Sequence, residues 1–325
     1  MRKPYLKLRQ PVFDGAGAQM LRIFSTYAIS KNWNLHFTYD KLSSVYTQVF
    51  KHGDEIDLWN NFLEKALPIP QNVPSKFDCV VNHIRHHPSL LFSQIRSLNF
   101  LGFHCLHIID SPQVIIKRFP KYLNCLQTLE GISHFRKPRK SGDLTIAIHI
   151  RQGEVSLSQF RSRHLPLSYF ESILANISSL LMNECINFKV NLYLEPNQEK
   201  TLDANDPLIT HSLSVDPDNP NLIAISQNQF RILNETPSQL KTPHLYLATL
   251  NQSESAYETF MGLLNADIVI ISKSSFSYLA GLLNSDSLVI YPEQWDPPLS
   301  TWISAKHVAD FRFNFSRWVQ TYFQN

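Results

Sequence analysis

The second half of the sequence alternates short apolar runs with stretches of helical spacing, and this alternation strongly limits the possible folds. The apolar runs are residues 144–150, "FKVNLYLE" (188–195), "HLYLATL" (244–250), "DIVIIS" (267–272) and "SLVIY" (287–291). Helical patterns separate them: one that Pro166 can open and that runs to Ile177, then "SAYETFMGLLN" (255–265) and "SFSYLAGLLN" (275–284). Strands that alternate with helices predict βαβ units and a parallel sheet. We therefore expect an α/β fold.

The first half begins with the same pattern. An apolar run at Tyr5–Leu8 is followed by "DGAGAQ" (14–19) and a helical pattern that ends near Asn32–Asn34. Residues 42–135 are mostly helical in pattern, and the polar, basic stretch "HFRKPRKSGD" (134–143) then separates the halves. We predict two α/β domains, 1–140 and 141–325. The apolar stripe of residues 315, 318, 319, 322 and 323 predicts a docked terminal helix.

Composition excludes several classes of function. The formal net charge of +3 is small and its basic residues are dispersed, which argues against a nucleic-acid-binding protein. No apolar segment reaches the roughly 18 residues of a membrane span, so at most peripheral membrane association is expected. The four cysteines show no CxxC spacing, and we read them as free, buried thiols of a cytoplasmic protein.

The strand "LTIAIHI" (144–150) ends in a basic pair. Because side chains alternate along a strand, His149 and Arg151 share the face opposite to Ile148 and Ile150. Ligands of open parallel sheets bind at the carboxyl ends of the strands, where an arginine fork suits a phosphate. The alternative is an arginine paired with a nearby carboxylate beside a core histidine.

A serine cluster follows the strand "DIVIIS". Ser274, Ser275 and Ser277, with Ser272 before them, surround the expected start of the next helix. The N–H groups of a helix N-terminus form an anion site, and small hydroxyls add donors. Plain helix capping would need only one of these serines.

The turn "DGAGAQ" opens the first expected helix. Gly15 and Gly17 would let the backbone approach a ligand closely, and Gln19 follows them. The spacing matches neither a dinucleotide-binding GxGxxG nor a P-loop, so a simple tight turn explains it equally well.

Together, "GAGAQMLRIFSTYAISK", "IAIHIRQGE" and "YETFMGLLNADIVIISKSSFSYLAGLLN" resemble the three blocks of the fucosyltransferase superfamily, with the closest similarity to bacterial α1,2-fucosyltransferases. The α1,6- and protein O-fucosyltransferases are relatives in that superfamily. The blocks make up a small part of the 325 residues but keep the family's order. The serine block is the most specific of the three.

The resemblance implies a GT-B fold, in which two Rossmann-like domains face a cleft. The N-terminal domain (1–140) would be the acceptor side, and the C-terminal domain (141–325) would bind the donor, with the terminal helix docking back. It also implies inverting, metal-independent transfer of fucose from GDP-fucose, without a cofactor, to a hydroxyl group of a glycan acceptor.

The resemblance also implies roles for particular residues. Arg151 would hold the β-phosphate, and His149 would support the same end of the donor. The other donor contacts would come from the serine turn, from an acidic position before it and from the first domain: Ser274, Ser275, Phe276 and Ser277, Glu258, and Gly15, Gly17 and Gln19.

The sequence departs from the family pattern HxRRGD at two positions: Gln152 replaces an arginine and Glu154 replaces an aspartate. In the other two blocks, Ala18 stands in place of an asparagine and Tyr278-Leu279 in place of paired tryptophans. These departures leave two alternatives: a GT-B transferase for another nucleotide sugar, or an inactive nucleotide- or glycan-binding module. Inversion needs a carboxylate base. Glu154 is the first candidate because it lies three residues past Arg151, and Asp14 is the second.

A histidine-rich region offers a competing zinc hypothesis. His83, His86, His87, His104 and His107 lie close in sequence to one another and to Cys105. No carboxylate flanks the histidines as in HExxH, so we predict no metal site and expect them to be acceptor-side, surface or core residues.

Overall fold

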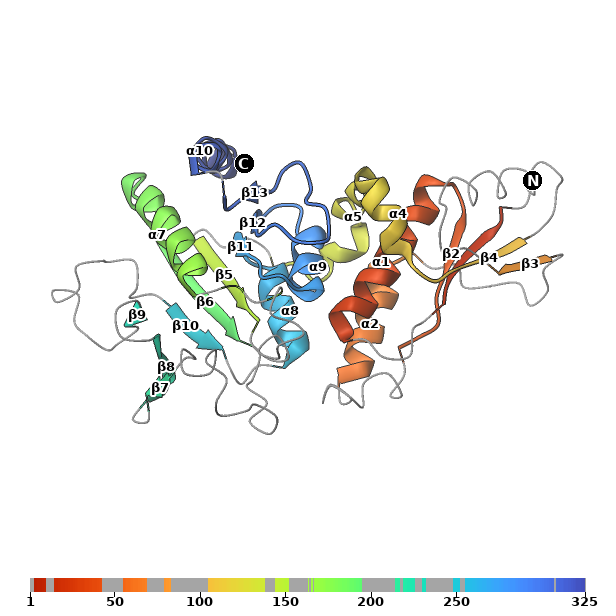
Figure 1. Ribbon diagram of the computed structural model, residues 1–325, viewed down its shortest axis with the longest axis horizontal. Helices are drawn as coiled ribbons and strands as arrows, with labels where there is room; N and C mark the ends of the chain where they lie inside the picture. Colours follow the sequence, from red (N-terminus) through yellow and green to blue (C-terminus); the bar gives the residue numbers. More distant parts are fainter. Residues whose placement is uncertain are drawn as a thin grey trace. The chain divides into compact units, whose positions relative to one another are not determined.

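A computed structural model of the chain describes residues 3–9, 15–42, 55–68, 79–82, 105–137, 144–151, 163, 165, 167–194, 214–216, 219–225, 230–231, 248–251, 255–306 and 308–324. The chain divides into two compact units (Figure 1). Unit 1 comprises Met1–Arg136, Leu282–Ser285 and Gln294–Ser300, and unit 2 comprises Lys137–Gly281, Asp286–Glu293 and Thr301–Asn325. Each unit contains a parallel sheet with helices, which confirms the predicted α/β class.

Unit 2 is built on a six-stranded sheet. Its strands are β5 (Leu144–Ile150), β6 (Phe188–Leu194), β10 (Ala248–Asn251), β11 (Ile268–Ile270), β12 (Leu288–Tyr291) and β13 (Ile303–Ser304). They lie in the order β10-β6-β5-β11-β12-β13, and every pair is parallel. Numbered in chain order within this sheet, the arrangement is 3-2-1-4-5-6, the strand order of a Rossmann fold.

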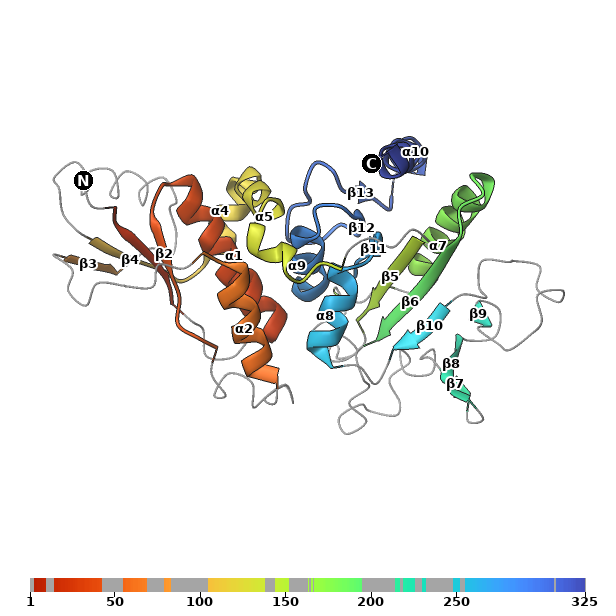
Figure 2. The ribbon, with the colours of Figure 1, turned by 180° about the vertical axis from the view of Figure 1, so that it is seen from behind.

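The alternation predicted for β5 explains how the sheet is covered. Leu144, Ile146, Ile148 and Ile150 lie in one hydrophobic cluster with residues of α7 (Leu167–Asn183) and α10 (Val308–Gln324). In α10, Phe315 and Val319 are buried in that cluster, as the apolar stripe predicted. The other face of the sheet carries α8 (Ala256–Leu264) and α9 (Ser275–Leu283), as Figures 1 and 2 show.

Asp267 closes the amino edge of this sheet. Its carboxylate accepts a hydrogen bond from the backbone N–H of Thr145 at 2.8 Å and one from the hydroxyl of Tyr322 at 2.6 Å. Its backbone carbonyl accepts a hydrogen bond from Leu288 N–H at 2.9 Å. One side chain and its backbone therefore connect the starts of β5, β11 and β12 to the end of α10.

Unit 1 has a smaller parallel sheet. Its strands β1 (Tyr5–Leu8), β2 (His36–Thr38), β3 (Cys79–Asn82) and β4 (Cys105–Ile109) lie in the order β2-β1-β4-β3. The helical segments of the unit are α1 (Ala16–Asn32), α2 (Ile56–Ala66), α4 (Pro112–Arg118), η3 (Pro120–Leu123), α5 (Asn124–Gln127) and α6 (Glu130–Ser133). The rings of Phe24 in α1 and Phe62 in α2 pack with centroids 6.2 Å apart.

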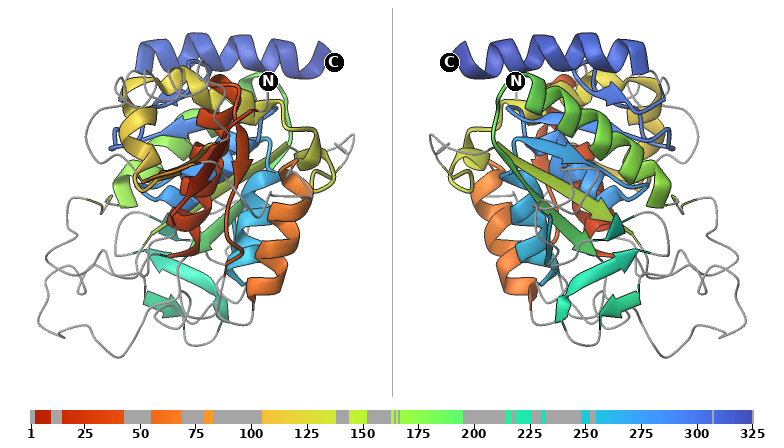
Figure 3. Two further views of the ribbon diagram at one scale, coloured as in Figure 1. Left: turned by 90° about the vertical axis from the view of Figure 1, so that its right-hand side faces the viewer. Right: turned by 90° about the vertical axis from the view of Figure 1, so that its left-hand side faces the viewer.

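Two sequence-based expectations need correction, and one element group was not predicted. Residues 42–135 contain two strands, β3 and β4, besides helices; they are only four and five residues long, too short for a clear period in the sequence. A small antiparallel sheet of β7 (Ser214–Asp216), β8 (Asn219–Ile225) and β9 (Phe230–Arg231), visible in Figure 3, lies in a part of the chain for which the sequence predicted no element. Cys185 is exposed and Cys125 is half-buried, whereas Cys105 is buried as expected; all three are free thiols.

Within the described residues, no helix is both long and apolar enough to span a membrane.

Gly262 sets the distance between α8 and the sheet. A Cβ atom at this position would lie 2.1 Å from the hydroxyl oxygen of Tyr193 in β6, whose side chain is buried. Gly15, at the start of α1, has nothing within 4 Å of such an atom and an ordinary φ of −64°.

We expect Gly262→Ala to lower the free energy of unfolding by about 1–3 kcal/mol, because the methyl group would displace the packed Tyr193 ring. Alanine otherwise favours a helix interior over glycine by about 1 kcal/mol, so destabilisation would report the steric conflict. Urea denaturation measures the change. Gly15→Ala is the control for a position where a new Cβ atom meets nothing, and it should lose only the preference of an N-cap for glycine over alanine, about 0.5–1 kcal/mol. Stabilisation by Gly262→Ala would contradict this packing.

Candidate functional site

The candidate site lies at the carboxyl edge of the unit 2 sheet, between β5 and β11. From β5 the chain proceeds through β6 to β10 on one side, and then returns to β11 on the other side of β5. Neighbouring strands whose connections leave in opposite directions form a topological switch point, where open α/β sheets bind ligands. The register pairs Ile148 with Ile270, so the residues that follow each strand emerge side by side.

His149 is the penultimate residue of β5 and is only 2% exposed. Its Nδ1 lies 2.7 Å from Oγ of Ser272, which is also buried. Burial, and secondarily the positive charge of Arg151, lowers the pKa of His149 to about 3. The imidazole is therefore uncharged at neutral pH, and its polar contact is with the serine turn.

Arg151 directly follows β5 and is half-buried. Its charge is close enough to His149 to lower the pKa of that imidazole. The two residues that the sequence presents as a basic pair therefore differ in state: Arg151 is a cation, and His149 is a neutral hydrogen-bonding group behind it.

The four serines after β11 have distinct positions. Ser274 caps α9, since its Oγ accepts a hydrogen bond from the backbone N–H of Phe276 at 3.3 Å. Ser277 is fully buried and donates to the carbonyl oxygen of Ser274 at 3.4 Å, while its Oγ lies 3.5 Å from that of Ser272. Ser275 is half-buried and forms no side-chain hydrogen bond within the described residues.

The start of α9 also carries backbone donors. Ser274 N–H donates to the carbonyl oxygen of Ser272 at 2.8 Å, and Tyr278 N–H makes the first helical bond, to Ser274 at 3.0 Å. Within the part of the chain that the structure describes, the N–H groups of Ser275 and Ser277 have no acceptor. Three serines thus build a rigid turn, and what the turn can offer a ligand is backbone N–H groups and one hydroxyl.

Aromatic rings hold this turn in place. The ring of Phe276 lies 5.5 Å from the imidazole of His149, and also 5.5 Å from the ring of Phe260 in α8, which it meets edge-on. Tyr278 is 1% exposed and packs edge-on against Trp302 at 5.2 Å. Tyr278, which replaces a tryptophan of the family pattern, is therefore a core residue, whereas Phe276 is only half-buried.

Glu258 has a structural contact of its own. Its carboxylate accepts a hydrogen bond from Ser255 N–H at 3.1 Å, and its backbone N–H donates to Ser255 Oγ at 3.1 Å. This reciprocal pair is a capping box at the start of α8. The side chain remains exposed, and nothing in the described structure tests the donor contact that the resemblance implies for it.

The first-domain residues lie in unit 1, at the start of α1. Gly15 is its N-cap, Gly17 is buried in the first turn, and Gln19 is 5% exposed. Near them, the carboxyl ends of β1 and β4 are joined by an ion pair of the protein itself: Arg9 Nε lies 3.4 Å from Asp110 Oδ1. The carboxyl edge of the unit 1 sheet, which corresponds to the candidate site in unit 2, is therefore partly occupied by contacts within the protein.

Both candidate bases, Glu154 and Asp14, lie outside the described residues, as does Gln152. The same holds for His83, His86, His87 and His104 of the zinc hypothesis. His107 is a fully buried residue of β4, beside the buried Cys105. Among the described residues no group of three or more histidine, cysteine, aspartate or glutamate side chains could hold a metal ion.

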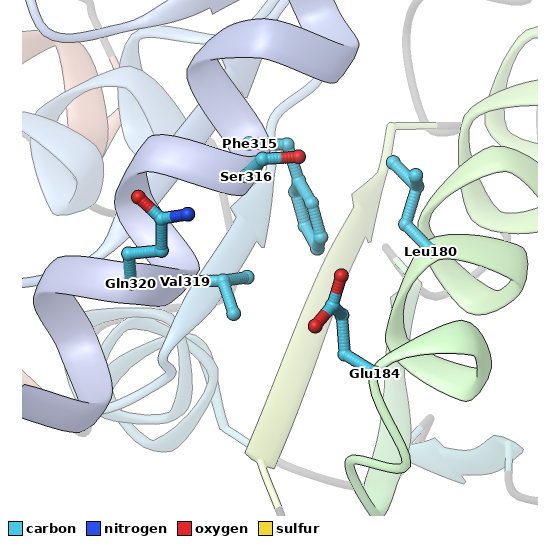
Figure 4. Close-up of a pocket in the computed structure, with 6 residues that line it drawn as sticks. All are labelled: Leu180, Glu184, Phe315, Ser316, Val319 and Gln320. Carbon is cyan, nitrogen blue, oxygen red and sulfur yellow. The ribbon is translucent and has the colours of Figure 1, made fainter.

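Figure 4 shows a small cavity elsewhere in unit 2, between α7 and α10. It has a volume of about 40 Å³ and is lined by Leu180, Glu184, Phe315, Ser316, Val319 and Gln320. A space of this size holds one or two water molecules and cannot accept a nucleotide.

Sequence reasoning missed the role of Ser272. The sequence places it at the end of an apolar strand, where its small polar side chain is conspicuous, but its bond to His149 depends on the pairing of β5 with β11.

Comparison with known proteins gives weak similarities. No family model and no curated protein matches the sequence. Among solved structures, the chain is similar to a mutant of FUT1 from Arabidopsis thaliana in complex with GDP, with 12% identity, a TM-score of 0.39, and coverage of 91% of this chain and 73% of that one. It is also similar to NodZ, an α-1,6-fucosyltransferase co-crystallised with GDP, with 14% identity, a TM-score of 0.30, and coverage of 87% and 93%. Scores this low establish neither the family nor the activity of this chain.

The neutral state of His149 predicts a pH dependence of stability. The unfolded chain takes up a proton near pH 6.5, whereas the folded chain does so only near pH 3. The free energy of unfolding therefore falls as the pH is lowered from about 6.5 towards 3, by up to about 1.4 kcal/mol per pH unit from this residue. Urea denaturation at several pH values should show a shallower fall for His149→Gln, which cannot be protonated. Equal slopes for both proteins would show that His149 is not buried as a neutral group.

The capping box predicts different outcomes for two substitutions of Glu258. Glu258→Ala removes the side-chain acceptor and should lower the free energy of unfolding by about 0.5–1 kcal/mol. Glu258→Gln keeps an acceptor for Ser255 N–H and should be close to the wild type. Chemical denaturation at neutral pH measures both. Equal losses in the two variants would mean that the negative charge, and not the hydrogen bond, stabilises α8.

Proposed function

We propose that this protein is a glycosyltransferase that transfers fucose from GDP-fucose to a hydroxyl group of a glycan. One observation carries the proposal. Arg151 and the start of α9, which belong to two separate blocks of the sequence resemblance, lie at neighbouring strand ends of one topological switch point. We further propose a GT-B fold, in which unit 2 is the donor domain and unit 1 carries the acceptor side.

In this proposal the diphosphate of the donor lies against Arg151 and the start of α9. The guanidinium can form two parallel hydrogen bonds to a phosphate group, and the N–H group of the half-buried Ser275 adds a donor at the positive end of the helix dipole. The neutral His149 acts indirectly, because its bond to Ser272 holds the turn that presents these donors. Phe276 is half-buried and offers part of a ring face to the ligand.

The reaction that fits these groups is an inverting displacement. The acceptor oxygen forms a new bond to C1 of fucose while the bond from C1 to the phosphate oxygen breaks, and the electron pair leaves with GDP. The proton of the acceptor hydroxyl passes to a carboxylate base, for which Glu154 is the first candidate and Asp14 the second.

Negative charge grows on the leaving diphosphate during this step. Arg151 and the N–H groups of α9 would stabilise it without a metal ion, since they are held in place before the reaction. The resemblance likewise implies a metal-independent reaction.

Two other functions remain as alternatives. A transferase for a different nucleotide sugar would use the same phosphate contacts with another base or sugar. A binding module without activity is the second, and the departures at Gln152 and Glu154 from the family pattern favour it.

Arg151→Ala tests the phosphate contact. We expect at least a tenfold weaker affinity for GDP, equivalent to about 1.4 kcal/mol or more, because a charge-assisted bidentate contact is lost. Isothermal titration calorimetry measures the affinity, and assays with GDP-fucose measure transfer. Arg317→Ala, which removes an exposed arginine of α10, is the matched control and should bind GDP normally. Unchanged GDP affinity in Arg151→Ala would refute the proposed site.

A panel of nucleotide sugars separates the alternatives in the same experiment. A ligand at 100 times its dissociation constant stabilises the folded protein by about 2.7 kcal/mol, which a thermal shift detects. Selective stabilisation by GDP-fucose with release of GDP supports the transferase. Stabilisation by another nucleotide sugar favours the first alternative, and binding without turnover favours the second.

A further inference from the structure

A short polar segment of unit 1, Gln294–Asp296, is not used by the proposed transfer. It follows β12 in the chain and belongs to the same unit as α4, which carries Lys117. Asp296 is 5% exposed, and its Oδ2 has no hydrogen-bond partner within the described residues. The side-chain nitrogen and oxygen of Gln294 are also buried, and neither has a partner there.

Three unpartnered polar atoms on two residues are unusual, because buried polar groups are nearly always hydrogen-bonded. Each such atom lowers the stability of the folded protein. Gln294 as a whole is only half-buried, so rotation about its side-chain bonds can bring its amide to the surface.

The types of these atoms restrict the ligand. Gln294 Oε1 and Asp296 Oδ2 require hydrogen-bond donors, whereas Gln294 Nε2 requires an acceptor. A hydroxyl group can serve as both. A phosphate dianion offers only acceptors, and a metal cation cannot accept from Nε2 and would be repelled by Lys117, whose charge acts on Asp296.

Trp295, between the two polar residues, provides an apolar surface. It is 37% exposed, and its indole N–H donates to the Asp296 carboxyl group. Burial raises the pKa of Asp296 to about 6, against the opposing effects of Lys117 and of this hydrogen bond. An aromatic face beside a carboxylate and an amide suits a molecule with hydroxyl groups at its rim and C–H groups on its face.

We propose that Gln294, Trp295 and Asp296 form a subsite for the hydroxyl groups of a carbohydrate, the glycan acceptor. The assignment to the acceptor depends on the proposed transferase function. The binding of a carbohydrate by these residues does not depend on it.

The first test needs no ligand. Gln294→Leu removes two unpartnered atoms, so we expect its thermal unfolding midpoint to rise by about 2–4 °C in the free protein. Gln127→Leu replaces a half-buried glutamine of unit 1 that has no buried unpartnered atoms, and its midpoint should be unchanged. A lower midpoint for Gln294→Leu would mean that ordered water or the protein itself satisfies the amide, and it would overturn the proposal.

The second test measures binding. Lactose, cellotriose, maltotriose and mannotriose are titrated into the wild type while tryptophan fluorescence is recorded. We expect at least one to bind, with an affinity at least tenfold lower in Gln294→Leu and Asp296→Ala. Trp295→Phe, which keeps a ring but removes the indole, should lose the fluorescence change. If no oligosaccharide binds, or if the variants bind as the wild type does, the proposal is wrong.

GDP titration of the same proteins separates the two proposals. Normal GDP affinity in Gln294→Leu together with lost oligosaccharide binding supports this subsite. Oligosaccharide binding in a wild type that does not bind GDP would also support the carbohydrate subsite, while refuting the proposed donor site.

Discussion

The pairing of β5 with β11 is the interaction on which the rest of unit 2 depends. It joins two halves of the sheet, β10-β6-β5 and β11-β12-β13, which the chain builds in opposite directions. The three paired residues Ile268–Ile270 set the register, and the same register brings Ser272 within hydrogen-bonding distance of His149. The position of the candidate site therefore follows from the geometry of the backbone. The side chains at this position supply its charge and its hydrogen-bonding groups.

The two edges of this sheet have different characters. At the amino edge, Asp267 satisfies Thr145, Leu288 and Tyr322, so that end is closed by internal hydrogen bonds. At the carboxyl edge, the start of α9 and the cation Arg151 lie at neighbouring strand ends. Most hydroxyl groups of the serine turn form hydrogen bonds within the turn itself. Such a division suits a site that stabilises charge, because groups that do so are most effective when they do not reorganise.

Much of unit 2 could be predicted from the sequence, because its signals are local. The alternation in Leu144–Ile150 and the apolar stripe around Phe315 and Val319 both correctly indicated which residues face the core. The strands β3 and β4 were missed, since they are only four and five residues long and have no clear period in the sequence. The sequence could not predict that His149 is neutral or that the serines form hydrogen bonds within the protein. Both depend on the tertiary contact between β5 and the turn after β11. The segment Gln294–Asp296 has no periodic pattern, so only the burial of its atoms reveals it.

The uncharged imidazole of His149 has a consequence for how strongly the edge can hold an anion. Of this pair, only Arg151 would attract a diphosphate by its charge, and oriented backbone dipoles, which carry no counterions to release, would add to that attraction. Affinity for such a ligand would then depend less on ionic strength than if His149 were charged. A bound diphosphate would also be held less firmly than if His149 carried a second positive charge. In such a site, product dissociation would be less prone to limit turnover.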